Sequence, residues 1–240
     1  MQLVTNEKLA TSRFRLGTVL HMVALAVLIA GLFVSLQVTP TTTNPVLLFA
    51  PYLAVIVFFV PYFFGKQLVQ RYGPKHRQDA ALAQAIKGLD NRYTLITFAA
   101  PNLPDYLLVS PNGVTVLLPR PHTGTLICRG QSWDQQDVSP IVKFYNTVWG
   151  VPLGNPTRDL ESAKEQVIRE LRARLGDAAD SVPVQGVVVF TSPQARLRLE
   201  GCAVQAASTK SLKNLLRSKG GLSSALVTRV REALIPETIP

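Results

Sequence analysis

Charged side chains are absent from a long stretch near the start of this sequence, between Leu16 and Gly65. A polar segment at 39–45 divides the stretch into two apolar runs, 17–38 and 46–64. A helix needs about 20 apolar residues to cross a bilayer, and in lipid it satisfies its own backbone hydrogen bonds. The missing charge therefore predicts a hairpin of two membrane-spanning helices. Because neither run has a polar face, a hairpin buried in a soluble core is disfavoured.

The turn between the two runs also lacks charge, whereas basic residues flank both runs. They are Lys8, Arg13 and Arg15 before the first run, and Lys66, Arg71, Lys75 and Arg77 after the second. Lys and Arg near the ends of membrane helices stay on the cytoplasmic side. We therefore expect both termini and the soluble domain to be cytoplasmic and, by analogy, the membrane to be a prokaryotic inner membrane. The alternative is a cleaved signal peptide, but the first run exceeds the usual ~7–15 apolar residues and lacks a small-x-small cleavage site.

The sequence contains only two cysteines, Cys128 and Cys202, which are too few and too far apart for a metal knuckle. In a cytoplasmic domain we expect them to be reduced and to act as small core residues. No Walker loop and no G-x-S-x-G motif occur, so nothing indicates a P-loop nucleotidase or an α/β-hydrolase.

Acidic residues are scarcer than basic ones, and the formal net charge is +10. Much of the excess lies in the flanks of the two apolar runs, and within 78–240 it is concentrated from Arg196 onward. A basic flank beside a membrane suits anionic lipid headgroups or nucleic acid, although a solvated basic face is the simpler interpretation. We divide the chain into 1–77, which holds an N-terminal arm, the hairpin and a basic connector, and 78–240, which has the length of one ordinary domain.

Hydrophobic periodicity and turn residues predict an α/β domain, a mixed sheet flanked by helices. The expected helices are 79–89, 155–175, 208–218 and 222–234. The expected strands are 93–99, two runs on either side of the turn 111–113 with the second ending at Pro119, then 125–129, 184–190 and a short strand at 203–206. An irregular stretch is expected from Trp133 to Gly154. Asn155 and Pro156 mark a helix start, because Asn caps free backbone N–H groups and Pro fits the first helical position.

Several of these features occur in a recognisable order. Asp105 precedes an apolar strand, the turn Pro111-Asn112-Gly113 and a second apolar strand; Gly124, Trp133, Asn155-Pro156 and the apolar run 187–191 follow. This set resembles the nuclease-related domain (NERD) family, a branch of the PD-(D/E)XK nuclease-like fold. The resemblance covers roughly 79–216 and implies a restriction-endonuclease-like fold.

The resemblance also implies metal-dependent chemistry, in which an Asp and a Glu on neighbouring strands hold a divalent cation and a Lys two residues after the Glu assists. Asp105 matches the family's Asp, but Leu118 stands at the position of the Glu and Arg120 at that of the Lys. Leucine cannot bind a metal ion, and hard cations such as Mg²⁺ prefer carboxylate oxygens. We therefore expect a degenerate catalytic site at Asp105 and Arg120, no cofactor, and a domain that binds nucleic acid or a protein partner.

Two other interpretations remain open. An active DNA endonuclease would need Mg²⁺ held by Asp105, Asp159 and Glu165, with Arg120 contacting phosphate; Asp79 and Glu161 are further acids that could rebuild such a site. A membrane scaffold would instead rest its basic end on lipid headgroups. The candidate nucleic-acid-binding residues are Arg120, Arg196, Arg198, Lys210 and Lys213.

Overall fold

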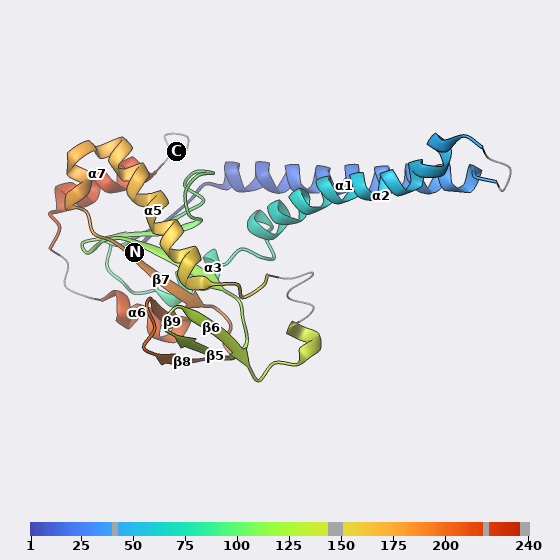
Figure 1. The fold of residues 1–240 in the computed structure, drawn as a ribbon. Coiled ribbons are helices and arrows are strands. Elements are labelled where there is room, and N and C mark those ends of the chain that lie inside the picture. Colours follow the sequence, from blue (N-terminus) through green and yellow to red (C-terminus); the bar gives the residue numbers. More distant parts are fainter. Residues whose placement is uncertain (40–42, 144–150, 218–220, 236–240) are drawn as a thin grey trace. The chain divides into compact units, whose positions relative to one another are not determined.

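The structure, a computed structural model, describes residues 1–39, 43–143, 151–217 and 221–235. The chain forms two compact units (Figure 1). Glu7–Arg77 is a helical hairpin, and Met1–Asn6 combines with 78–240 in an α/β unit. The predicted mixed α/β class, with a sheet flanked by helices and two long apolar helices, is confirmed.

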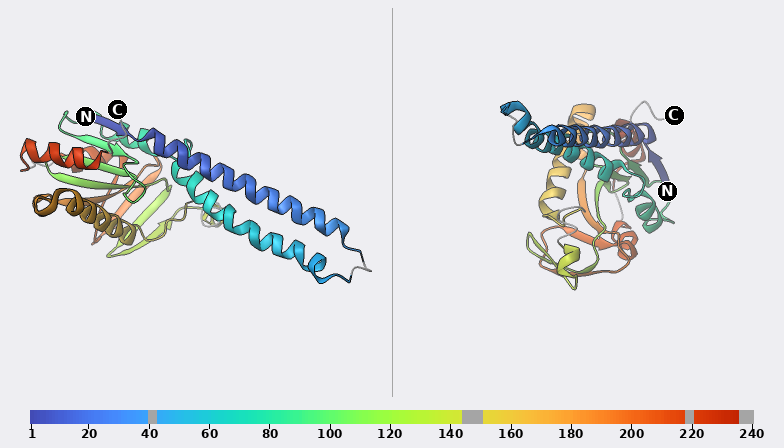
Figure 2. Two further views of the ribbon diagram at one scale, coloured as in Figure 1. Left: turned by 90° about the horizontal axis from the view of Figure 1, so that it is seen from above. Right: turned by 90° about the vertical axis from the view of Figure 1, so that its right-hand side faces the viewer.

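The hairpin consists of α1 (Glu7–Gln37) and α2 (Pro45–Tyr72), which run side by side (Figure 2). At the start of α2 the Asn44 side chain accepts a hydrogen bond from the Val46 N–H at 2.9 Å. Pro45 then takes the first helical position, where a missing N–H costs nothing. Both helices extend beyond the predicted spans into the basic flanks. Of the predicted turn, residues 40–42 lie outside the described part of the chain.

One side of α1 carries a buried small residue at every seventh position, namely Ala10, Gly17, Ala24 and Gly31. A seven-residue repeat keeps one side of a helix against its partner, and small side chains let two backbones approach closely. A Cβ added to Gly17 would lie 2.9 Å from the Cβ of Leu68. Close backbone packing therefore joins α1 to α2 and leaves the larger side chains outside.

The outward surface of the hairpin is almost entirely apolar. Among its exposed side chains are Phe33, Leu36, Phe49, Phe59 and Phe64. Soluble proteins rarely expose so large an apolar surface. His21 adds little polarity, because its Nδ1 lies 2.9 Å from the Gly17 carbonyl oxygen and its ring lies edge-on to Tyr62. Both helices are long and apolar enough to cross a membrane.

A six-stranded mixed sheet in the order β1-β2-β3-β4-β7-β9 forms the centre of the α/β unit. Its strands are β1 (Gln2–Thr5), β2 (Thr94–Thr97), β3 (Tyr106–Ser110), β4 (Gly113–Arg120), β7 (Val184–Phe190) and β9 (Gln205–Ser208). Strands β2, β3 and β4 are antiparallel neighbours, and β7 and β9 follow in parallel. The accompanying helices are α3 (Asp79–Ala85), α5 (Pro156–Leu175), the 3-10 helix η1 (Gly176–Ser181), α6 (Thr209–Leu216) and α7 (Ser224–Leu234).

The first strand of the sheet was not expected from the sequence. The sequence predicts only an N-terminal arm before the first apolar run, but β1 pairs in parallel with β2 over four residues, from Gln2 opposite Thr94 to Thr5 opposite Thr97. The Thr97 hydroxyl also donates to the Thr5 hydroxyl at 2.8 Å. Met1–Asn6 therefore belongs to the α/β unit, and the hairpin is inserted between β1 and α3.

The predicted hairpin turn at residues 111–113 is present between β3 and β4. Gly113 has a φ of +109°, and a Cβ there would collide with the Pro183 carbonyl oxygen. That same oxygen accepts a hydrogen bond from the Val114 N–H at 3.0 Å. Glycine is thus required both for the backbone conformation and for the close approach of the 183 segment. Strand β4 continues through Pro119 to Arg120, so the prediction that Pro119 ends it was wrong.

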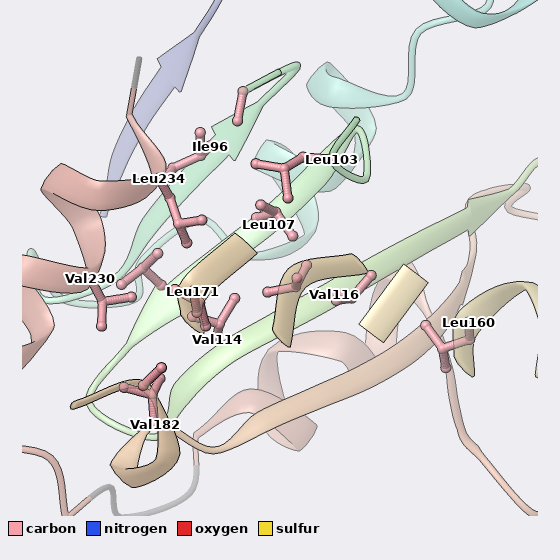
Figure 3. Close-up of a cluster of buried hydrophobic side chains, with 14 of the residues drawn as sticks. Ile96, Leu103, Leu107, Val114, Val116, Leu160, Leu171, Val182, Val230 and Leu234 are labelled. Atoms are coloured by element: carbon pink, nitrogen blue, oxygen red, sulfur yellow. The ribbon is translucent and has the colours of Figure 1, made fainter. Parts of the chain in front are cut away.

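Helix α5 covers one face of the sheet, and a single hydrophobic core fills the space between them (Figure 3). Leu107, Val116 and Leu171 are fully buried there. Gly186 on β7 allows the close contact, since a Cβ at this position would lie 2.7 Å from the Cγ of Leu160 on α5. The end of β4 is thereby held beside the first turn of α5.

A second sheet of three strands, β6-β5-β8, lies beyond the first in chain order. Only β5 (Gly124–Arg129) was predicted. Strand β6 (Ser132–Gln136) occupies part of the stretch predicted to be irregular, and β8 (Ala195–Glu200) was missed. Strand β6 is rich in polar residues and so has a weak hydrophobic pattern, whereas β8 alternates apolar and polar residues and was missed despite that pattern. The remainder of the irregular stretch includes residues 144–150, which lie outside the described part of the chain.

The two cysteines form a disulfide, contrary to the prediction of reduced core residues. Cys128 lies on β5 and Cys202 lies two residues beyond β8, and the parallel pairing of these strands brings their Cα atoms to 5.5 Å. Cys128 is fully buried, as expected, but Cys202 is only half-buried. A sequence separation of 74 residues concealed the pairing.

Candidate functional site

Two of the residues singled out by the family resemblance, Leu118 and Arg120, share one face of the central sheet. In the antiparallel pairing of β3 with β4, Leu107 lies opposite Val116, and both contribute to the core under α5. Side chains alternate along a strand, so Leu118 and Arg120 fall on the same face as Val116, and Leu118 packs at the edge of the core. Asp105 precedes the first residue of β3 and lies outside the strand.

Arg120 ends β4 and reaches from this face to helix α5. Its guanidinium forms an ion pair with the Asp159 carboxylate, and its side chain is only 15% exposed. Burial lowers the pKa of Arg120, and the nearby negative charge of Asp159 opposes that shift. The pair satisfies one end of the guanidinium, but the Nε of Arg120 is buried and has no hydrogen-bond partner among the residues that the structure describes.

Asp159 lies in the first turn of α5. The Asn155 side chain starts the helix by accepting a hydrogen bond from the Arg158 N–H at 3.2 Å, as predicted for the Asn-Pro pair. An acidic residue in a first turn is stabilised by the positive end of the helix dipole. Half of the Asp159 side chain remains exposed. The carboxylate proposed as a metal ligand is therefore already neutralised by the residue proposed as a phosphate contact.

The other candidate acids do not join this ion pair. Glu161 and Glu165 are exposed on α5, and an Asp79 carboxylate oxygen accepts a hydrogen bond from the adjacent Ala80 N–H at 3.0 Å. Asp105 is half-buried, and its backbone carbonyl accepts from the Phe98 N–H at 2.8 Å, which ties the start of β3 to the end of β2. Within the described ranges, no group of three His, Cys, Asp or Glu side chains could hold a metal ion.

His122, which was not predicted as a site residue, lies just beyond Arg120 and is 3% exposed. Its Nε2 lies 3.1 Å from the Val151 carbonyl oxygen and so carries the ring proton. Its Nδ1 is buried without a partner. Burial, followed by the positive charge of Arg120, holds the pKa of His122 below its ordinary value. A lone His after a strand gives no pattern from which this burial could have been predicted.

A shallow cavity of about 260 Å³ opens beside His122. Trp133 and Gln135 from β6 and Leu153 from the segment before α5 contribute to its wall. The Trp133 indole N–H donates to the Thr157 hydroxyl at 2.8 Å, and this bond fixes β6 against the start of α5. Trp133 thus has a structural role in this fold, joining the small sheet to the central helix.

The basic candidates lie on other elements than Arg120. Arg196 and Arg198 are exposed on β8, while Leu197 between them packs toward the core, so both guanidinium groups face outward. Within the described part of the chain, neither forms an ion pair. Lys210 is exposed on α6, and Lys213, half-exposed, extends over Gly88. The structure therefore separates the predicted binding residues into a buried Arg120 and an outward-facing set on β8 and α6.

Comparison with known proteins adds no relative: no protein-family model matches the sequence, and neither the curated proteins nor the solved structures contain a similar chain.

Proposed function

We propose that this chain is a membrane-anchored, nuclease-like (NERD-type) domain protein that has lost its catalytic centre and binds nucleic acid from the cytoplasmic side. The observation that carries the proposal is the Arg120–Asp159 ion pair. It occupies the face where the family resemblance places the metal site, and Leu118 replaces the second carboxylate there. A lone Asp105 is a poor ligand set for a hard cation, which takes several oxygen ligands.

The order of the elements supports this fold assignment. The leading helix α3, the β3–β4 hairpin with its glycine turn, the central helix α5 and the following buried strand β7 occur in one unit around one sheet. The family resemblance predicts these elements, and they follow one another along the chain in the order that it predicts. Leu118 and Arg120 lie on the face of β4 that α5 covers, which is where the proposal puts the remnants of the catalytic site.

The pairing of β1 supports the membrane arrangement. Strand β1 precedes the hairpin and β2 follows it, yet the two pair in one sheet. Residues 1–6 and 78–240 must then lie on the same side of any membrane that the hairpin crosses, so the chain crosses it an even number of times. Cleavage of the first helix as a signal peptide would remove β1. The basic flanks of both helices favour the cytoplasm as the shared side.

Nucleic acid is the favoured ligand because Arg196 and Arg198 project from the same face of β8, and within the described part of the chain neither forms an ion pair. Two guanidinium groups on one exposed strand can contact successive phosphates, and Arg pairs with phosphate through two parallel hydrogen bonds. Such binding releases counterions and weakens steeply as salt increases.

The test uses the full chain in nanodiscs of uncharged lipid, incubated with supercoiled plasmid and Mg²⁺ or Mn²⁺, beside Asp105→Asn. We expect no metal-dependent cleavage. Cleavage that requires metal and disappears in Asp105→Asn would overturn the proposal in favour of an active endonuclease. An active endonuclease would require Asp159 to leave Arg120 and join Asp105 at a metal site.

Binding is measured with the same nanodiscs and a fluorescent DNA duplex over a range of salt concentrations. The double variant Arg196→Gln/Arg198→Gln should make the slope of log Kobs against log[salt] shallower by about 2. The control Arg169→Gln/Arg229→Gln removes the same charge from exposed positions on α5 and α7. Equal slopes in both variants would show that β8 is not the contact. Binding to anionic vesicles without binding to DNA would favour a lipid surface instead.

A further inference from the structure

The disulfide lies in the small sheet that presents the two outward arginines. Cys128 is on the central strand β5, fully buried, and Cys202 follows the edge strand β8 and is half-buried. The bond therefore connects the end of the arginine-bearing strand to the interior of the unit.

Few other contacts hold the end of β8 in place. Four of its six residues are exposed, and its ladder partner is β5. The Arg129–Glu200 ion pair at its end joins two largely exposed side chains, and such pairs contribute little. Beyond the strand, the Ala203 N–H donates to the Gly130 carbonyl oxygen at 2.8 Å. The strand also pairs with β5 along all six of its residues, so the disulfide adds a covalent restraint at the end of a partly exposed ladder.

The charge of the hairpin flanks places this disulfide in an unusual compartment. Basic residues at the outer ends of both helices favour the cytoplasm, where thiol reductants keep most cysteines reduced. A cytoplasmic disulfide in an ordinary protein is usually transient, and serves catalysis or redox sensing. The flanking charges indicate a reducing compartment, whereas the paired cysteines indicate an oxidised state. A disulfide that forms and breaks reversibly is consistent with both.

We propose that Cys128 and Cys202 form a reversible redox pair that controls the binding of nucleic acid by β8. The disulfide form holds Arg196 and Arg198 on an ordered strand, and the dithiol form releases the end of that strand. The control of binding rests on the proposed nucleic-acid function, and the reversibility of the bond rests on the cytoplasmic location proposed above. The ordering of β8 by the disulfide is measured without either.

The exposure of the two sulfur atoms determines the order of the exchange steps. A thiolate of a reducing dithiol attacks Sγ of Cys202, the more exposed sulfur, and Cys128 leaves as a thiolate that takes up a proton. The second thiolate of the dithiol then attacks the dithiol's first sulfur, the one bonded to Cys202 in the mixed disulfide, and releases Cys202 as a thiolate that takes up a proton. The dithiol is oxidised to a disulfide, and the chain gains two electrons and two protons. The Gly130 carbonyl oxygen, 3.6 Å from Sγ of Cys128, can accept a hydrogen bond from the buried thiol.

The experiment compares three samples of the full chain in uncharged nanodiscs. The first is the oxidised chain, the second is the chain equilibrated with reduced glutathione or dithiothreitol, and the third is the variant Cys202→Ser. Amide hydrogen exchange of 195–200 is the first measurement. Exchange there should accelerate at least tenfold on reduction and in Cys202→Ser, while exchange in β7 stays unchanged. A disulfide that resists both reductants in the folded chain, or β8 exchange that does not change after reduction, would overturn the proposal.

The second measurement is binding of the fluorescent DNA duplex to the same samples. The salt slope should be shallower by about 2 in the reduced form, matching the loss seen in Arg196→Gln/Arg198→Gln. The double arginine variant should show no further change on reduction. If β8 exchange responds to reduction but no form binds DNA, the redox-dependent ordering stands and the nucleic-acid function fails. Equal DNA binding by both redox forms, with β8 exchange responding, would refute the control of binding alone.

Discussion

Excision of the membrane hairpin with β1 retained tests whether the first residues are part of the soluble unit. Two hydrogen bonds hold the ends of the excised segment close together. The Asn6 N–H donates to the Thr97 carbonyl oxygen at 3.1 Å, and the Gln78 N–H donates to the Tyr106 hydroxyl at 2.9 Å. Thr97 and Tyr106 are themselves opposite each other in β2 and β3. A flexible linker of about six residues can therefore join Asn6 to Gln78 without disturbing the sheet.

The comparison is with a chain that begins at Gln78 and lacks β1 altogether. That chain loses the Gln2 N–H bond to the Tyr93 carbonyl, the Asn6 bond described above and the Thr97–Thr5 hydroxyl bond. At about 1 kcal/mol for each bond these three bonds alone contribute about 3 kcal/mol, and the loss of the β1–β2 ladder adds to it. For a domain of this size, the three bonds alone lower the melting temperature by roughly 6–12 °C, which is the minimum expected.

The assay is thermal unfolding of both soluble chains, followed by circular dichroism. The linked chain should unfold cooperatively at the higher temperature, and the chain that begins at Gln78 at the lower one. A third chain with Thr5→Val and Thr97→Val keeps the backbone ladder and should lie between them. Equal melting temperatures for the first two chains would refute the assignment of β1 to this unit.

Three further substitutions test the site and the turn. In urea unfolding, Asp159→Asn should destabilise the chain by about 1–2 kcal/mol, because it removes the negative charge that pairs with the largely buried Arg120. The control Glu165→Gln changes an exposed residue and should alter stability by less than about 0.5 kcal/mol. The pKa of His122 is lowered in the folded chain, so just below pH 6.5 only the unfolded chain takes up the proton. Acidification from about pH 7.5 to about 5.5 should therefore lower the melting temperature more in the native chain than in His122→Asn. Equal decreases in melting temperature would contradict the buried neutral ring. Gly113→Ala should cost about 3 kcal/mol or more in the same urea assay, and a cost below about 1 kcal/mol would show that the turn relaxes away from its neighbouring carbonyl.

Local sequence patterns predicted those parts of the fold that depend on neighbouring residues. The turn at 111–113 and the helix start at Asn155 both follow from residues within a few positions of each other. The two apolar helices follow from a continuous run without charge. In each case the physical cause, a backbone preference or a missing polar group, is contained in the segment itself.

Parts that depend on distant partners were not predicted. Strand β1 has four residues and forms only because β2 presents an open edge. Cys128 and Cys202 meet only because β8 pairs with β5. Arg120 and Asp159 were both identified as site residues, but with separate roles. Their contact depends on how closely α5 approaches the end of β4, which no local pattern determines.

The insertion of the hairpin between β1 and β2 imposes an order of events during synthesis. Thr5 leaves the ribosome early, but its partner Thr97 follows 92 residues later, after both apolar helices. At ordinary rates of translation β1 waits about 5–20 s without a partner. An unpaired strand edge invites association with other chains, and a strand of only four residues limits that hazard. The central sheet can be completed only after both apolar helices and β2 have been synthesised, so β1–β2 pairing is a late step in the folding of the α/β unit.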